Sequence, residues 1–221
     1  INVEIAALER DVLVLRRHEK DFLMRKDVSY QDKFNKTMQE LNQGLNSLEH
    51  DLTAHDIDTG SLKIFRQQTA LYQQKFESLV KTAQQVGLDP QSGLYGALRA
   101  AAHQLEAEFK QVNNDTLLVS LLQLRRAEKD FMLRADLKYL DSFNAEFGRF
   151  KSLLAGQNAS EALQSAADSY AEAYRNLVAG SQTMGLKHDQ GIMGEMRKAV
   201  HETETSLKAM TDKANAALEQ A

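Results

Sequence analysis

The chain contains the same pattern twice, and this duplication constrains its fold more than any other feature. The segment LRRHEKDFLMRKDVSYQDKFN, residues 15–35, recurs as LRRAEKDFMLRADLKYLDSFN, residues 124–144. A second pair, GLYGALRAAAHQLE at 93–106 and GIMGEMRKAVHETE at 191–204, shares the pattern G-x-x-G-x-[LM]-R-x-A-x-H-x-x-E. Repetition on this scale indicates two copies of one unit, each made of a long helix followed by two shorter ones.

Composition favours helices throughout the chain. The 221 residues include a single proline, Pro90, and no cysteine or tryptophan, and apolar residues recur at steps of three and four. The lack of cysteine excludes a disulfide framework, thiol catalysis and Cys-ligated metal centres. A formal net charge of -4 argues against nucleic acid as a partner, because such proteins normally present a basic face.

Helical periods and the turn residues between them predict six helices, two long and four short, over residues 3–52, 61–86, 92–112, 115–155, 159–184 and 190–221. Short loops make successive helices antiparallel neighbours. We therefore expect an all-α fold of two stacked four-helix bundles that share both long helices. Both chain ends would lie at the same end, which is the arrangement that an extracytoplasmic domain between two membrane helices requires. On this expectation residues 1–27 and 136–221 form the membrane-proximal module and residues 28–135 the membrane-distal module.

These motifs, in this order, resemble the helical bimodular sensor domains of bacterial methyl-accepting chemotaxis receptors and of some sensor histidine kinases. The resemblance covers the whole chain and depends on both RRxEKDF copies and both GxxGxxRxxxH copies. It implies a periplasmic ligand-binding domain of a bacterial inner-membrane receptor, flanked by two transmembrane helices outside this chain. It also implies a homodimer and small organic acids as ligands.

Charged residues on the predicted buried stripes are the candidate binding groups. On a helical wheel Glu19 falls inside the apolar sector and Arg16 close to it, and Glu128 and Arg125 repeat these positions. A buried arginine can hold a carboxylate through two parallel hydrogen bonds. The predicted ligand-binding residues are Arg16, Arg17, Glu19, Lys20, Arg197 and His201 in the proximal module, and Arg125, Arg126, Glu128, Lys129, Arg99 and His103 in the distal one.

A structural interpretation of the same charges stays open. The arginines and glutamates can neutralise one another as a buried polar layer that fixes helix register. Arg17 and Arg126 point outward, to solvent or to a dimer contact. Arg197 and Arg99 flank the core, and His201 and His103 lie still further round their helices, at the surface or an interface. The sequence shows no catalytic motif and implies neither a metal nor a cofactor. The rival functions are a sensor domain of a histidine kinase, which would read a periplasmic binding protein, and a structural spacer or partner-binding helical bundle without a small ligand.

Overall fold

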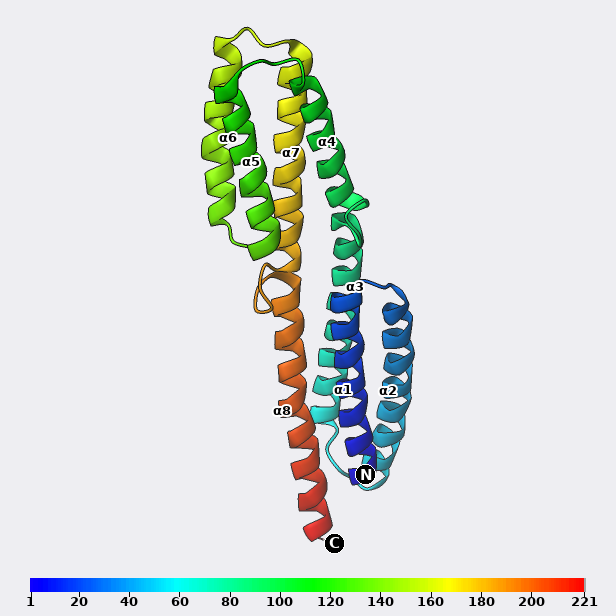
Figure 1. The fold of residues 1–221 in the computed structure, drawn as a ribbon. Helices are drawn as coiled ribbons and strands as arrows, with labels where there is room; N and C mark the ends of the chain where they lie inside the picture. The colour runs from blue at the N-terminus through cyan, green and yellow to red at the C-terminus, as the bar shows by residue number, and fades with distance from the viewer. Residues whose placement is uncertain (221) are drawn as a thin grey trace. The chain divides into compact units, whose positions relative to one another are not determined.

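The computed structural model describes residues 1–220, and within them the fold is all-helical, with eight α-helices and no strand. Figure 1 shows these helices along the chain. In order, they are α1 (Asn2–Arg25), α2 (Ser29–Ala54), α3 (Gly60–Val86), α4 (Gly93–Phe109), α5 (Asp115–Arg134), α6 (Lys138–Gly156), α7 (Glu161–Met184) and α8 (Gly191–Glu219).

The prediction of six helices is wrong, because each expected long helix is broken at the same point of its repeat. Lys26 and Ala135 end α1 and α5 in the left-handed conformation, with φ of 53° and 51°. The carboxylates of Asp27 and Asp136 then accept hydrogen bonds at 2.9 Å from the backbone N–H of Ser29 and Lys138, respectively. A left-handed residue reverses the chain, and a carboxylate at the start of the next helix satisfies a free N–H group. Each break therefore makes an antiparallel hairpin, α1 with α2 and α5 with α6 (Figure 1).

The chain forms two compact units, each with four helices. Unit 1 comprises residues 1–81 and 188–221, with α1, α2, α8 and most of α3, and unit 2 comprises residues 82–187, with α4 to α7 and the last turn of α3. The expected modules, 1–27 with 136–221 and 28–135, have different boundaries. The hairpins explain the difference, because α2 returns along α1 and α6 along α5.

A cluster of four aromatic rings forms the centre of unit 1. The ring of Phe76 stacks on that of Phe34 with centroids 4.2 Å apart, and Phe22 meets Phe76 edge-on at 5.8 Å. Tyr72 packs against Phe34 at 5.3 Å. All four side chains are at most 1% exposed. Edge-on and offset contacts of this kind stabilise a core beyond the burial of its area.

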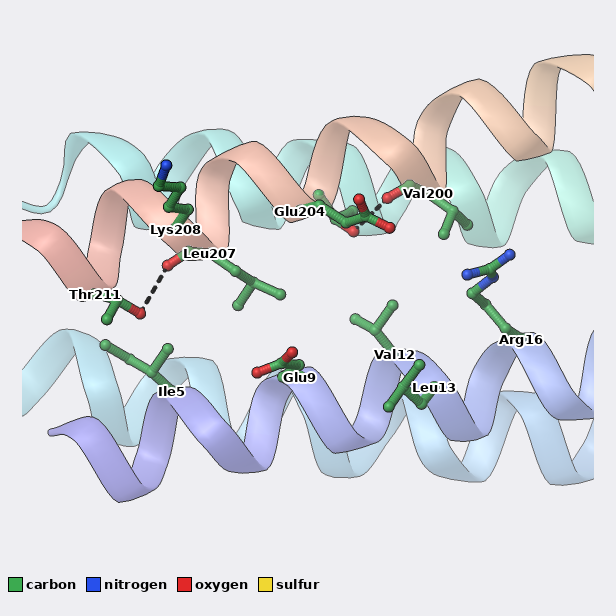
Figure 2. Close-up of a pocket in the computed structure, with 11 residues that line it drawn as sticks. Ile5, Glu9, Val12, Leu13, Arg16, Val200, Glu204, Leu207, Lys208 and Thr211 are labelled. Atoms are coloured by element: carbon green, nitrogen blue, oxygen red, sulfur yellow. Dashed lines mark hydrogen bonds between the residues drawn. The ribbon is translucent and has the colours of Figure 1, made fainter.

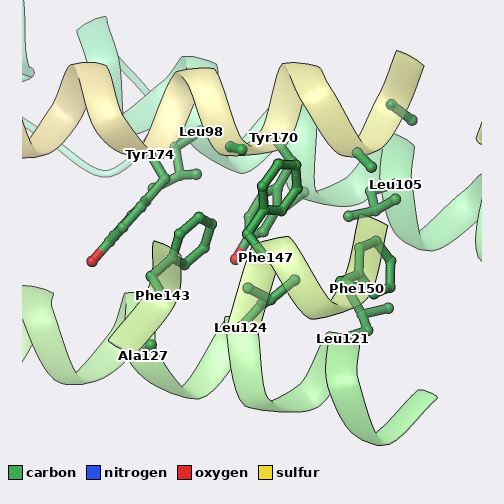
Figure 3. Close-up of a cluster of buried hydrophobic side chains, with 14 of the residues drawn as sticks. Leu98, Leu105, Leu121, Leu124, Ala127, Phe143, Phe147, Phe150, Tyr170 and Tyr174 are labelled. Atoms are coloured by element: carbon green, nitrogen blue, oxygen red, sulfur yellow. The ribbon is translucent and has the colours of Figure 1, made fainter. Parts of the chain in front are cut away.

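Unit 2 repeats this cluster with the equivalent residues, of which Figure 3 labels Phe143, Tyr170 and Tyr174. Phe143 and Tyr174 lie 4.1 Å apart, Phe131 meets Tyr174 edge-on at 6.1 Å, and Tyr170 packs against Phe143 at 5.6 Å. Phe147 and Phe150 extend the core toward the other end of α6. The duplication seen in the sequence is therefore also a duplication of packing.

The glycine that opens each end-repeat has a conformational role. Gly93 and Gly191 both have φ of 57° at the first residue of α4 and α8. A Cβ atom at Gly93 would lie 2.5 Å from the carbonyl oxygen of Gln85, too close for any side chain. The predicted starts of these two helices at 92 and 190 are therefore correct to within one residue.

Candidate functional site

An arginine, a glutamate and a tyrosine form a polar cluster in unit 1. The hydroxyl of Tyr72 on α3 donates a hydrogen bond to the carboxylate of Glu19 on α1, and Arg16 lies one turn before Glu19. Burial raises the pKa of Glu19, and the Tyr72 hydroxyl and the charges of Arg16 and Lys20 oppose that rise. Burial and the nearby carboxylate raise the pKa of Tyr72 well above its usual range. Tyr72 therefore remains a hydrogen-bond donor at neutral pH.

Unit 2 contains the equivalent cluster with an additional partner. The Tyr170 hydroxyl donates to Glu128 at 2.5 Å, and Arg125 Nε lies 3.0 Å from Glu128 Oε1. Another nitrogen of the same guanidinium, Nη1, donates to the carboxylate of Glu106 on α4. The guanidinium carbon also lies 6.0 Å from the centroid of the Tyr170 ring. Arg125 is therefore held between two carboxylates and an aromatic ring.

The arginine of unit 1 lacks these ion pairs. Arg16 is half-buried, yet it makes no ion pair within 4.0 Å among residues 1–220. Glu204, the equivalent of Glu106, also forms no ion pair with residues 1–220. A half-buried guanidinium with free N–H donors is the group that a carboxylate ligand would complete.

Arg16 opens into a groove of about 380 Å³ between α1 and α8, shown in Figure 2 and here called the α1–α8 groove. It is lined by Ile5, Glu9, Val12, Leu13, Arg16, Val200, Thr203, Glu204, Leu207, Lys208 and Thr211. The Arg16 side chain extends from α1 toward α8 (Figure 2). Glu9 and Glu204 stand on opposite walls, whereas Lys208 points away from α1.

Unit 2 has a groove of about 470 Å³ in the equivalent position, here called the α4–α5 groove. Most lining residues of the two grooves correspond through the repeats: Arg16 with Arg125, Leu13 with Leu122, Val12 with Leu121, Glu9 with Leu118, Glu204 with Glu106, Leu207 with Phe109, and Lys208 with Lys110. The two units therefore have a groove in the same position. They differ in their arginines, because Arg125 forms ion pairs with Glu106 and Glu128, whereas Arg16 forms none with residues 1–220.

The structure brings together only part of each predicted residue set. Arg16 with Glu19, and Arg125 with Glu128, face inward as expected; Glu128 is 5% exposed. The other eight are exposed and line neither groove: Arg17, Lys20, Arg197, His201, Arg126, Lys129, Arg99 and His103. Arg16 is therefore the one cation of the predicted proximal set that lines the α1–α8 groove, and Arg125 is the one cation of the predicted distal set that lines the α4–α5 groove.

Sequence reasoning missed two contributors to each site. Tyr72 and Tyr170 were visible as an equivalent pair of the repeat, but an aromatic residue on an apolar stripe gives no sign of the carboxylate beneath it. Glu106 and Glu204 are the last residues of the repeated G-x-x-G pattern and lie three residues after the predicted His103 and His201. Residues three apart are neighbours on a helix, about 60° apart around its axis, so each glutamate borders the groove while the histidine lies just outside it.

Within residues 1–220, no group of His, Asp and Glu side chains is arranged to hold a metal ion, and no helix has the length and apolarity needed to cross a membrane. No protein-family model, curated protein or solved structure matches the chain.

Proposed function

We propose that the chain is the extracytoplasmic, periplasmic sensor domain of a bacterial transmembrane chemoreceptor, and that it binds a small organic acid through Arg16. The observation that carries the proposal is a half-buried arginine without an ion-pair partner in residues 1–220, in the wall of a groove. The motif resemblance supports the receptor class, including a homodimer and flanking transmembrane helices. The end-to-end stacking of two bundles, which the sequence predicts, belongs to the same proposal.

Signal transmission would use the two helices that line the groove. A carboxylate on Arg16 of α1 that also contacts α8 favours one relative position of these helices over another, and α8 continues to residue 219. A ligand shifts such an equilibrium by its difference in affinity for the two positions. Displacements of about 1–2 Å between packed helices are sufficient in other switches.

The observations in unit 2 favour a structural role for its cluster. Arg125 already contacts Glu128 and Glu106, so a second carboxylate would have to displace one of them. We therefore assign the organic-acid site to unit 1 and a polar layer that fixes helix register to unit 2.

A thermal unfolding screen with mono-, di- and tricarboxylates tests the proposal. A carboxylate that binds only the folded chain raises its stability, by about 2.7 kcal/mol at a hundredfold excess over Kd. The Arg16→Met variant should lose this rise. Arg17→Met, which removes the same charge from the exposed neighbouring position, should keep it. If no carboxylate stabilised the wild-type chain, or if both variants behaved alike, the proposal would be wrong.

A further inference from the structure

The charges of the α1–α8 groove suit a ligand with two opposite charges better than a simple acid. Arg16 supplies a positive charge at one end, and Glu9 and Glu204 supply negative charges from α1 and α8 further along the groove (Figure 2). None of these three side chains forms an ion pair with any residue from 1 to 220. Lys208 lies one turn after Glu204, but its side chain points away from α1.

Apolar side chains separate the two charged regions. Val12 lies between Glu9 and Arg16 on α1, and Val200 and Leu207 face it from α8. Glu9 and Arg16 are seven residues apart in sequence; at 1.5 Å per residue this places their backbones about 10 Å apart along the helix. A linear ligand that carries a charge at each end of an aliphatic chain of several carbons can span this separation.

The repeat supplies a comparison within the molecule. In the α4–α5 groove, Leu118 stands where unit 1 has Glu9, and the remaining glutamate, Glu106, is paired with Arg125. Unit 2 thus has neither the free guanidinium nor the facing carboxylates. The pair of facing acids is a feature of unit 1 alone, and two carboxylates across a groove repel each other unless a cation lies between them.

We propose that the α1–α8 groove binds an ω-amino acid, with the ligand carboxylate on Arg16, its methylene chain over Val12 and Val200, and its ammonium group between Glu9 and Glu204. This inference rests on the proposed function and specifies the chemical class of its ligand. The ammonium group supplies the cation that the two glutamates lack, and the carboxylate supplies the anion that Arg16 lacks.

Calorimetric titration of the full chain with 6-aminohexanoate, hexanoate and hexylamine tests the inference. We expect 6-aminohexanoate to bind at least about tenfold more tightly than either single-charge analogue, since each analogue leaves one charged region unpaired. Glycine carries both charges without the spacer, so it should bind no better than hexanoate. Circular dichroism and thermal unfolding would establish that each variant retains its helices.

Paired variants identify the groups involved. Glu9→Gln/Glu204→Gln should weaken 6-aminohexanoate about tenfold and leave hexanoate within about twofold. Glu77→Gln/Glu202→Gln removes the same charge from exposed positions outside the groove and should leave both affinities unchanged. Arg16→Met should weaken both ligands.

The outcomes separate this inference from the proposed function. If hexanoate bound as tightly as 6-aminohexanoate and depended on Arg16, the ω-amino acid assignment would be overturned and the organic-acid site would stand. If hexylamine bound as tightly as 6-aminohexanoate, or if glycine did, the assignment would also fail. Absence of binding by all four compounds, together with a carboxylate screen that stabilises nothing, would overturn both proposals.

Discussion

The two units contain the same arginine, glutamate and tyrosine, but they pair them differently. In unit 2, Arg125 contacts both Glu128 and Glu106, whereas in unit 1 Arg16 forms no such ion pair with the described residues, although Glu204 occupies the position of Glu106. The repeated motif therefore determines which side chains face inward, but equivalent residues form ion pairs with the arginine in unit 2 and none with it among the described residues of unit 1. One scaffold holds an ion-paired arginine in unit 2 and, in unit 1, an arginine that lines a groove and forms no ion pair with residues 1–220.

Removing each arginine should have the largest effect and should differ between the units. Arg125→Met leaves Glu128 buried without a cation, and breaking a buried pair in this way costs about 3 kcal/mol. Arg16→Met should cost about 1 kcal/mol, because Glu19 has no ion pair among residues 1–220 to lose and keeps its hydrogen bond from Tyr72. Urea unfolding followed by circular dichroism measures both free energies of unfolding. Equal losses would show that the two clusters are energetically alike.

Replacing Glu19 and Glu128 by glutamine should change the stability of the chain in opposite directions at neutral pH. Burial raises the pKa of Glu19 above its ordinary value of 4.5. At pH values between 4.5 and the raised pKa, the folded state therefore keeps a proton that the unfolded state has released. Relative to Glu19→Gln, the wild type should therefore lose stability as pH rises from 4.5 through the raised pKa. Each pKa unit between the folded and unfolded states corresponds to about 1.4 kcal/mol. Glu128→Gln should instead destabilise the chain at pH 7, since it removes the partner of Arg125.

Unfolding free energies measured from pH 4 to pH 8 for the wild type and both variants test this difference. A wild-type curve parallel to that of Glu19→Gln across the whole range would contradict the raised pKa. A stable Glu128→Gln variant at pH 7 would contradict the view that the ion pair of unit 2 is a structural element.

The helical class and the inward-facing charges could be predicted from the sequence because both follow from periodicity. The apolar stripe that contains Phe22 places Arg16 and Glu19 beside the core, and the repeat carries the same result to unit 2. The hairpins could not be predicted in this way. Tyr30 continues the stripe in phase with Phe22, so the apolar pattern shows no interruption at Lys26. The only local signal is Asp27, which also suits an exposed position within a helix.

The two grooves could not be predicted from the sequence for a related reason. A groove depends on which helices are neighbours, and the predicted continuous helices paired different segments. In the sequence, Lys208 is an ordinary charge of the last helix, and Glu204, although it closes the repeated pattern, gives no sign that it faces another helix. Only the packing of α1 beside α8 shows that Glu204 and Glu9 stand across from each other.

The smallest expected effect concerns the outer partner of Arg125. Glu106 is half exposed, so Glu106→Gln should cost only about 0.5 kcal/mol, and the loss should shrink at high salt because exposed ion pairs are screened. The Glu106→Gln variant makes unit 2 resemble unit 1, because Nη1 of Arg125, which lines the α4–α5 groove, loses its carboxylate partner. Titration with hexanoate should then reveal a second, weaker site, absent when Glu108, a partly exposed neighbour on α4 that does not line the groove, is changed to Gln instead. If Glu106→Gln left the number of bound hexanoate molecules unchanged, the ion pair of Arg125 with Glu106 would not be what prevents hexanoate from binding in unit 2. The ion pair of Arg125 with Glu128 would then be the explanation.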